Sequence, residues 1–200
     1  PMAAVAGSVA DNILNVLVKD TKLEKAYVNN GGDVSFYLTE NQTVKSSLAS
    51  IPNIIAEIDY KDKSRGIATS GWRGRSFSLG IADSVTVLAD NAAMADAAAT
   101  MIANSVNIKN HPLIIKKPAE EIYEDSDLKN LMVTVEVGDL KQSEIEDALR
   151  NGNEVGKTYL ENGLINSALI ELHNCFCIVQ KESTNLNFIN KSSLKKINYV

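Results

Sequence analysis

The sequence has few of the residues that build metal clusters and nucleic-acid interfaces. It contains two cysteines and two histidines in 200 residues, whereas a structural zinc site usually needs four Cys or His ligands. Acidic residues outnumber basic ones, 25 to 20, and a nucleic-acid-binding protein normally presents a basic face. We therefore expect no nucleic-acid partner.

Long apolar runs are also missing. No stretch of about 18 apolar residues occurs, so no membrane-spanning segment is predicted. The first residues, PMAAVAGSVADNIL, lack a basic leader and contain Asp11, and they predict a helix rather than a signal peptide. We expect a cytoplasmic protein without a membrane partner, and the 44% hydrophobic content is enough for one ordinary domain or two small interlocked ones.

The two cysteines, Cys175 and Cys177, stand one residue apart in HNCFCIVQ. A strand would hold both on one face with His173, which leaves a zinc or redox site open. A role in the core is favoured, because three ligands fall short of four and a buried Cys commonly behaves as a small hydrophobe. No partners for a Ser-His-Asp triad are evident around His173 or His111.

Helices and strands are mixed without a regular βαβ rhythm, which predicts an α+β fold with a largely antiparallel sheet. Apolar spacing predicts helices over Ala3–Val18 and Asn91–Val106 and a short helix over Ser143–Arg150, capped by Ser143 with Glu146 three residues on. Strands are predicted on both sides of the glycine pair in AYVNNGGDVSFYL, and in NIIAEIDY, GIATSG, DSVTVLAD, LMVTVEVG and LINSALIELHNCFCIVQ, the last with a turn near Asn174.

The sequence divides into two parts. Residues 1–106 carry the candidate motifs and form the expected core. Residues 107–200 follow a connector with Pro112 and Pro118 and are expected to complete the same α+β fold, with a polar and loose tail from about residue 183. The acidic stretch AEEIYEDSD predicts a solvated surface.

Arginine is scarce, with four residues in all, yet Arg65, Arg73 and Arg75 fall within RGIATSGWRGR. The guanidinium fork suits phosphate or carboxylate, and the interleaved glycines let backbone N–H groups approach an anion. Thr69, Ser70 and Ser76 add hydroxyl donors. The segment predicts an anion site, although it does not have the order of a P-loop; a solvated turn with surface arginines is the alternative.

Asp96 and Thr100 stand four residues apart in NAAMADAAATMIA. On a helix they project from one face, one above the other, and the surrounding alanines let another backbone come close. A carboxylate, a hydroxyl and backbone carbonyls suit Mg²⁺ when phosphate and water complete its octahedron. Alternatively, Asp96 caps or pairs locally while Thr100 bonds back to the carbonyl of residue 96.

The segment NNGGDV is the third candidate. Its glycines permit positive φ and leave room for a ligand, and Asp33 offers a second carboxylate. A hairpin turn without any ligand explains the same residues equally well.

These three segments, in this order, resemble the ApbE superfamily, whose best known members are flavin transferases that use FAD and a divalent metal to attach FMN to a protein threonine. GIATSG is similar to the family's Ala-Thr-Ser-Gly strand, and NNGGD to its Gly-Gly-Asp turn. SVTVLADNAAMADAAAT is similar to its Ser-Val-Thr-Val strand and the following Ala-Asp-x3-Thr helix, and AVAGSVAD more weakly to its early Ala-Ile-Ala-Lys-Gly stretch. The similarity covers roughly residues 3–106 and is greatest to a short soluble branch, uncharacterised protein family 0280.

The resemblance implies an ApbE-like, T-fold-like architecture of antiparallel sheets with packed helices. It also implies that Asp96, Thr100 and the carbonyl of Ala6 hold a metal, Mg²⁺, and that a nucleotide-type ligand, FAD, binds in a cleft. The resemblance places Gly31, Gly32, Thr69, Ser70 and Gly71 in that cleft, and the residue analysis adds Asp33, Arg73 and Arg75.

Two parts of the flavin transferases are absent from this sequence. Their His-x-Asp-Pro-x-Thr-Gly hairpin is replaced by the twelve residues WRGRSFSLGIAD. The upstream part of the family fold, which helps to hold the flavin ring, would precede Pro1. We therefore expect a removed N-terminal segment or a second chain, such as another copy in a homo-oligomer, to supply it.

The sequence thus predicts a Mg²⁺-dependent protein that binds a flavin nucleotide or transfers FMN, with its catalytic residues unassigned. One alternative is a flavin- or anion-binding accessory protein on the same scaffold, without transfer activity. Another is a self-processed hydrolase in which the secondary amine of an N-terminal Pro1 acts as base or nucleophile.

Overall fold

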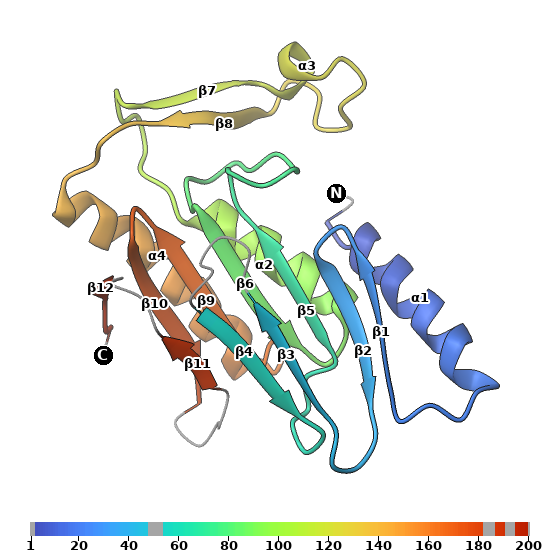
Figure 1. Cartoon of the computed structure of the whole chain (residues 1–200). Helices are drawn as coiled ribbons and strands as arrows, with labels where there is room; N and C mark the ends of the chain where they lie inside the picture. The colour runs from blue at the N-terminus through green and yellow to red at the C-terminus, as the bar shows by residue number, and fades with distance from the viewer. Residues whose placement is uncertain (1–2, 48–53, 182–186, 191–194, 200) are drawn as a thin grey trace.

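The computed structural model describes residues 3–47, 54–181, 187–190 and 195–199. The helices are α1 (Val5–Lys19), α2 (Ala92–Ser105), α3 (Ala119–Ile122) and α4 (Gln142–Glu161). The strands are β1 (Lys25–Asn30), β2 (Asp33–Leu38), β3 (Thr43–Ser47), β4 (Ile54–Asp59), β5 (Gly66–Ser70), β6 (Ser84–Ala89), β7 (Ile114–Pro118), β8 (Met132–Val137), β9 (Ser167–Leu172), β10 (Cys175–Gln180), β11 (Asn187–Asn190) and β12 (Lys195–Lys196). This mixture confirms the predicted α+β class (Figure 1).

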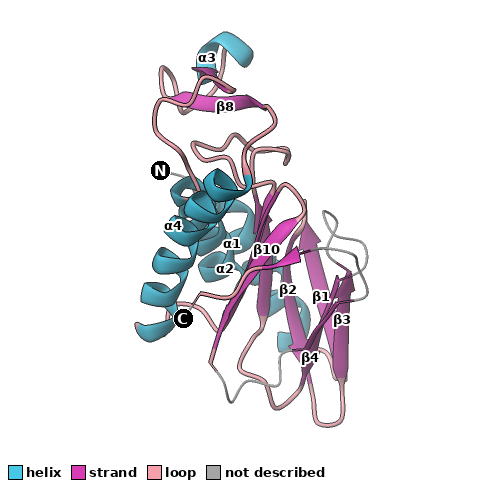
Figure 2. Cartoon of the chain, turned by 90° about the vertical axis from the view of Figure 1, so that its left-hand side faces the viewer, coloured by secondary structure: helices cyan, strands magenta, loops and turns pink. Residues whose placement is uncertain are grey.

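The main body has three layers. A seven-stranded sheet of order β1-β2-β5-β6-β9-β10-β12 forms the middle layer and is antiparallel except for the short β10–β12 pair. Figure 2 shows α1, α2 and α4 on one side of this sheet and the β11-β4-β3 sheet on the other. Because β6 and β9 are covered on both sides, every residue of SVTVLA and SALIEL is buried.

Two hydrophobic clusters hold these layers together. The larger lies between the helices and the sheet and includes Val85, Ile102, Leu149 and Ile170. The smaller lies between the two sheets and is built on Phe36, Ile58, Leu169 and Phe176. The alternation of side chains along β6 and β9 sends neighbouring residues into different clusters.

Helices α1 and α2 lie antiparallel, and a carboxylate of each helix accepts hydrogen bonds from backbone N–H groups at the N-terminus of the other. In α1, Asp11 accepts hydrogen bonds from the backbone N–H groups of Ala92 and Ala93 at 3.0 and 2.9 Å. In α2, Asp96 accepts one from the N–H of Gly7 at 3.0 Å. First-turn N–H groups lack partners within their own helix, so each carboxylate satisfies donors that the other helix leaves free.

The last helix is longer than the sequence indicated. α4 runs from Gln142 to Glu161, so the helix predicted over Ser143–Arg150 is confirmed but continues further toward the C-terminus. The predicted cap at Ser143 was wrong, because the N-cap is Lys141, whose N–H donates to Glu144 at 2.7 Å. Gly152 resembles a helix breaker in the sequence. In the structure it allows close packing, because a Cβ there would lie 2.5 Å from a Val106 methyl group.

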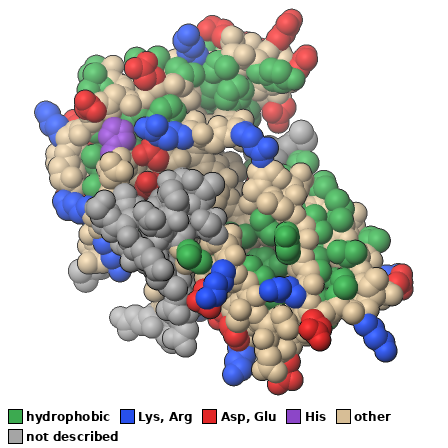
Figure 3. Space-filling model, viewed as in Figure 1, with side chains coloured by type: hydrophobic (Ala, Val, Ile, Leu, Met, Phe, Trp, Pro, Cys, Tyr) green, Lys and Arg blue, Asp and Glu red, His purple; other side chains and the backbone are tan. Residues whose placement is uncertain are grey.

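The connector after α2 contains a strand that the sequence analysis missed. β7 pairs with β8 in a ribbon that projects from the body and carries α3 at its end (Figure 1). Figure 3 shows hydrophobic side chains along this ribbon and acidic ones around its α3 end; the exposed hydrophobic residues include Leu113, Ile115, Leu131 and Met132. The charged side chains of AEEIYEDSD are exposed, as predicted.

The C-terminal strands meet at a turn of His173 and Asn174, both at positive φ. The predicted turn near Asn174 is confirmed, but His173 does not share a strand face with the cysteines. Cys175 and Cys177 are buried in the larger cluster as free thiols. A core position therefore explains them, as the composition favoured.

The predicted polar tail is only partly described. Residues 182–186, 191–194 and 200 lie outside the described residues, as does Pro1 at the other end. Residues 187–190 pair with β4 and residues 195–196 with β10, so these two described segments of the tail are strands, while the described residues 197–199 are in neither a helix nor a strand. Among the described helices, not one has the length and apolar character needed to cross a membrane.

We predict that Gly7→Ala destabilises the protein. A Cβ at Gly7 would lie 2.3 Å from the carbonyl oxygen of Ala92, so α1 and α2 would have to separate, and overpacking of this kind costs about 1–3 kcal/mol. The exposed neighbour variant Ser8→Ala is the control. Chemical denaturation would measure both, and equal stability of the two variants would contradict the tight helix contact.

Candidate functional site

A cavity of about 330 Å³ lies at one edge of the main sheet, where five segments meet. These segments are the start of α1, the β1–β2 turn, the end of β5, the loop after β5 and the middle of α2. In Figure 1 the ends of β1 and β5 that border the cavity lie below the β7–β8 ribbon. The lining residues are Ala6, Asn30, Gly31, Asp33, Thr69, Ser70, Gly71, Gly74, Arg75, Ser76, Asp96 and Thr100. All the predicted site residues except Gly32 and Arg73 are therefore in one place.

Asp96 and Thr100 both face this cavity from α2. Asp96 Oδ2 accepts the Gly7 N–H, and in the described part of the chain neither Asp96 Oδ1 nor Thr100 Oγ1 has a hydrogen-bond partner. The structure thus lacks the back-bond from Thr100 to residue 96 that was the alternative. The cap that Asp96 provides is also not local, since Gly7 is 89 residues away in sequence. One carboxylate oxygen and one hydroxyl remain available to a ligand.

The second carboxylate, Asp33, comes from the first residue of β2. Burial and the neighbouring Asp96 carboxylate raise the pKa of Asp33 from 3.8 to about 6, against the lowering effects of the Thr69 backbone N–H and Arg75. Burial also raises the pKa of Asp96, which the Gly7 N–H partly opposes. Two half-buried acids that repel each other and have one nearby guanidinium form a site that would be stabilised by a cation.

The three clustered arginines have three different roles. Arg75 donates to the carbonyl of Gly31 and so ties the loop after β5 to the β1–β2 turn at the cavity. The Nε of Arg73 instead donates to Asp83 at 2.6 Å, and its guanidinium lies over the Trp72 ring, 4.8 Å from the centroid. Arg65 donates to backbone carbonyls of residues 60, 62 and 64. Only Arg75 lines the small cavity.

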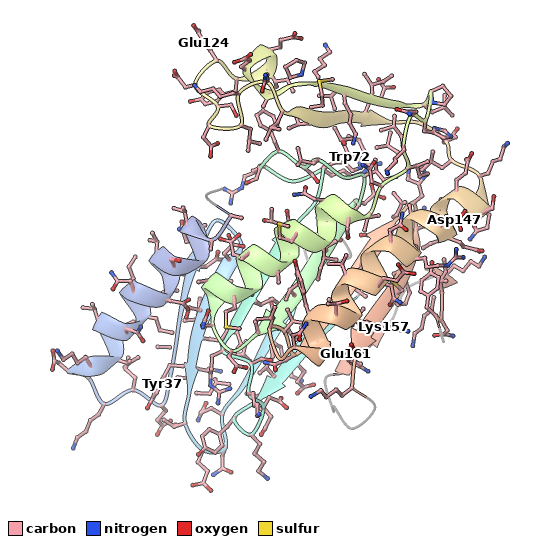
Figure 4. All side chains as sticks on the ribbon, turned by 180° about the vertical axis from the view of Figure 1, so that it is seen from behind. Tyr37, Trp72, Glu124, Asp147, Lys157 and Glu161 are labelled. Atoms are coloured by element: carbon pink, nitrogen blue, oxygen red, sulfur yellow. The ribbon has the colours of Figure 1, made fainter. Side chains whose placement is uncertain are left out.

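A larger cavity of about 830 Å³ adjoins the small one. The two share Thr69, Ser70, Gly71 and Gly74, at the end of β5 and in the loop after it. Arg73 lines the larger cavity, together with Asp83, Ser84, Val137, Asp139, Ile145, Glu171, His173 and Asn174. Trp72, labelled in Figure 4, lies between the ribbon and the main body.

Of the two remaining predicted residues, Ala6 lines the small cavity and Gly32 does not. Gly32 lies in the β1–β2 turn but is exposed and does not line either cavity. The carbonyl of Ala6 lines the small cavity, yet it accepts a hydrogen bond from Asn30 Nδ2 at 3.1 Å. That carbonyl therefore already has one hydrogen-bond partner, and the Asp33 carboxylate, to which the Thr69 backbone N–H donates, is a further oxygen donor in the same cavity.

Within the described ranges, no group of three or more His, Cys, Asp or Glu side chains could hold a metal ion. A zinc site at the cysteines is accordingly not supported. The small cavity offers two carboxylates and a hydroxyl, which are hard oxygen donors. Such a set suits Mg²⁺, which uses one or two carboxylates and fills its other positions with water and phosphate oxygens.

Sequence reasoning missed some residues of the two cavities. Asn30 lies within the predicted NNGGDV segment but was not singled out, whereas Ser76 lines the small cavity as one of the expected hydroxyl donors. Glu171 is different, because it is a single acid in the otherwise apolar strand SALIEL and is only 7% exposed. An acid in a strand of that composition is itself a signal, since buried carboxylates rarely occur without a partner.

We predict that Asp33→Asn stabilises the protein at about pH 7.5 but not near pH 4. The pKa of Asp33 is higher in the folded protein than its ordinary value of 3.8, so folding stability falls as the pH rises toward about 6 and stays lower above it. Solvent screening keeps the gain on the order of 1 kcal/mol or less.

Thermal melts across this pH range would measure the effect, with Asp125→Asn, an exposed carboxylate on the ribbon, as the control. An Asp33→Asn variant that is no more stable than the parent at about pH 7.5 would contradict the raised pKa.

Comparison with known proteins places these residues in a family. A family model described as AbpE bacteria matches residues 1–183. Among curated relatives, the chain is similar to a UPF0280 protein of Methanococcoides burtonii, with 39% identity over 112 residues, 54% of this chain and 46% of the relative. It is also similar to UPF0280 proteins of Methanobrevibacter smithii, with 36% identity covering 62% of this chain and 55% of the relative, and of Methanocaldococcus jannaschii, with 31% identity covering 68% and 56%.

The chain spans about half the length of these curated relatives. The family match, in contrast, covers all but the last residues of the chain, including every residue of the small cavity. The chain therefore belongs to the AbpE bacteria family.

Proposed function

We propose that this chain binds a diphosphate-containing nucleotide of the flavin type, FAD, together with Mg²⁺ in the small cavity. The observation that carries the proposal is the convergence of Asp33, Asp96 and Thr100 with Arg75 in one cavity. The sequence resemblance to the ApbE superfamily, which includes FMN transferases, supports the choice of ligand. The proposal extends to transferase-type chemistry, in which one half of the dinucleotide is passed to an acceptor.

Each part of the cavity has a role in this arrangement. Asp96 Oδ1, Thr100 Oγ1 and the Asp33 carboxylate would hold the ion, and Asp33 replaces the Ala6 carbonyl as the third protein ligand. Bound Mg²⁺ would neutralise phosphate charge. Arg75 and the hydroxyls of Ser70 and Ser76 supply hydrogen-bond donors for phosphate oxygens at the opposite wall.

The sizes of the two adjoining cavities support a ligand with a charged part and a ring system. The small cavity suits a compact and strongly charged group, while the larger has room for a ring system. The two cavities share Thr69, Ser70, Gly71 and Gly74, so one ligand would occupy both by lying across the end of β5.

Nucleotide binding without transfer is the second candidate function. The observation that favours it is the loop between β5 and β6, which contains no histidine in WRGRSFSLGIAD, where the flavin transferases carry His-x-Asp-Pro-x-Thr-Gly. A protein of this kind would hold the nucleotide for another component. Release of AMP from FAD separates the two candidates, because only the transferase-type protein breaks the diphosphate bond.

We predict that FAD with Mg²⁺ raises the melting temperature of the purified chain. At a ligand concentration about 100-fold above Kd the gain is about 2.7 kcal/mol, which corresponds to several degrees for a chain of this size. Asp96→Asn and Thr100→Val should remove most of it. We expect both substitutions to leave the fold intact, because Asn can still accept the Gly7 N–H and Thr100 Oγ1 has no partner in the described chain.

The control for both variants is Asp125→Asn on the ribbon, which should keep the full shift. Differential scanning fluorimetry with FAD, FMN, AMP and ADP, each with MgCl₂ or EDTA, would make the measurement. The proposal fails if none of these nucleotides changes the melting temperature.

A further inference from the structure

Helix α1 has an exposed apolar stripe that none of the described elements covers. Its residues recur every three or four positions and are between 43% and 69% exposed: Val5, Val9, Ile13, Val16 and Leu17. This spacing places them along one side of the helix. Figure 3 shows hydrophobic side chains on the part of the surface where Figure 1 places α1. A contiguous apolar stripe of this kind is typical of an interaction surface.

The stripe points sideways, past the β1 edge of the main sheet. Gly7 lies against Ala92 and so marks the side of α1 that faces α2. A helix turns by about 100° per residue, so Val16, nine residues on, is on the opposite side. The exposed polar residues Ser8 and Asn12 lie between these two sides. Since α2 covers β5 and β6 while α1 covers β1 and β2, the side of α1 opposite α2 faces past β1.

Strand β1, beside this stripe, is an edge strand without protection. Within the described chain it pairs only with β2, over six residues without a bulge. Its charged residue, Lys25, is at one end, and Tyr27 in the middle is 67% exposed. The opposite edge of the sheet, β12, is a two-residue strand of Lys195 and Lys196. Short charged edges of that kind prevent pairing between sheets, and β1 has neither property in its middle.

The stripe is complementary to itself when two copies of α1 pack antiparallel. In that arrangement Val9 meets Ile13 of the second copy. Four residues further out, Val5 meets Leu17, so a twofold axis passes at the level of residue 11. No charged side chain belongs to the stripe. The positive N-terminal end of each helix dipole then lies beside the negative C-terminal end of the other, which is a favourable pairing of charge.

The position of β1 supports the same axis independently. Asn30 of β1 donates to the Ala6 carbonyl of α1 at 3.1 Å, so the two elements are level at this point. Residue 11 lies five residues further along α1, about 7.5 Å at 1.5 Å per residue. In β1, which runs the opposite way, that distance is about two residues at 3.4 Å each. It reaches Val28, in the middle of the strand, so an axis there also pairs two β1 strands antiparallel.

A sheet continued from β1 to the β1 of a second copy places the two α1 helices at a normal packing distance. The axis of α1 lies over the space between β1 and β2, because the helix packs on both. With neighbouring strands about 4.8 Å apart, the two helices would lie about 10 Å apart, and packed helices are about 8–10 Å apart. The two stripes and the two Tyr27 side chains supply a contact on the order of 1,000 Å², which is the size of a specific interface.

We propose that two copies of this chain associate through α1 and β1, with an antiparallel α1 pair above a β1–β1 ladder that joins the two main sheets. The surface needs an apolar helix and a free strand edge at matching levels, and a second copy supplies both by symmetry. The inference goes beyond the proposed function and does not depend on it. It places the start of α1, which lines the small cavity, beside the dimer interface.

The test is the mass of the purified chain in solution, measured by sedimentation velocity over a wide concentration range. The parent should be a dimer. Val9→Lys and Ile13→Glu should each be monomeric, with the dissociation constant raised by about 100-fold or more, because each variant places an unpaired charge against an apolar side chain of the other copy. Asn12→Lys, on the polar side of α1, is the matched control and should stay dimeric. Circular dichroism should show the same helix content in all four proteins.

The two single variants also test the antiparallel arrangement. In a mixture, the lysine of Val9→Lys faces the glutamate of Ile13→Glu across one contact, while the second contact of the same pair remains Val9 with Ile13. The mixture should therefore form a dimer although neither variant does so alone. A mixture that stays monomeric would contradict the proposed pairing of the helices.

Hydrogen exchange of the parent gives a readout that needs no variant. On dilution to the monomer, peptides of α1 and β1 should lose protection, while peptides of the β7–β8 ribbon, which also has exposed hydrophobic residues, should not change. A parent that is monomeric at every concentration overturns the inference, even if lipid vesicles then protect α1. A dimer that is protected in the ribbon instead, or that survives Ile13→Glu, overturns it as well.

Discussion

Two carboxylates, Asp11 and Asp96, hold α1 and α2 together, each at the N-terminus of the other helix. An anion at such a terminus satisfies free N–H groups and interacts favourably with the helix dipole, and contacts of this type contribute about 0.5–2 kcal/mol each. Asp11 also accepts a hydrogen bond from Ser35 of β2, so the pair is tied to the sheet as well. These hydrogen bonds between the two helices determine where the start of α1 lies, and the start of α1 forms one wall of the small cavity.

The hydrogen bond from Gly7 explains how Asp96 can cap α1 with one carboxylate oxygen and line the small cavity with the other. Its Oδ2 is fixed by Gly7, which directs Oδ1 into the cavity beside Thr100. The small side chains of α2 make this possible, because buried alanines such as Ala95, Ala98 and Ala99 let the helix approach the sheet closely. Burial in this position raises the pKa of Asp33 and of Asp96. Carboxyl groups with shifted pKa values that line a cavity are a recurring feature of functional sites.

The two adjoining cavities are lined by different acids. Val85 and Ile170 join the core under the helices, whereas Ser84 and Glu171, one position along each strand, belong to the other face. Glu171 therefore meets the loop after β5 and the His173 turn, away from α2. As a result the carboxylates Asp33 and Asp96 line only the small cavity, while Glu171 and Asp83 line only the larger one.

Local pattern and spacing by themselves determined the α+β class, α1, α2, most strands and the grouping of Asp96 with Thr100, because each of these depends on residues close together in the chain. The end of α4 could not be predicted, since Gly152 reads locally as a helix breaker, and its close packing against Val106, a residue distant in sequence, is visible only in the structure. The separate roles of Arg73 and Arg75 also depend on tertiary contacts. Arg73 contacts Asp83, on the other side of the loop after β5, whereas Arg75 contacts Gly31, which is distant in sequence. Tertiary structure also brought Glu171 to the site, because a strand pairing between residues 84 and 171 joins segments that no local pattern connects.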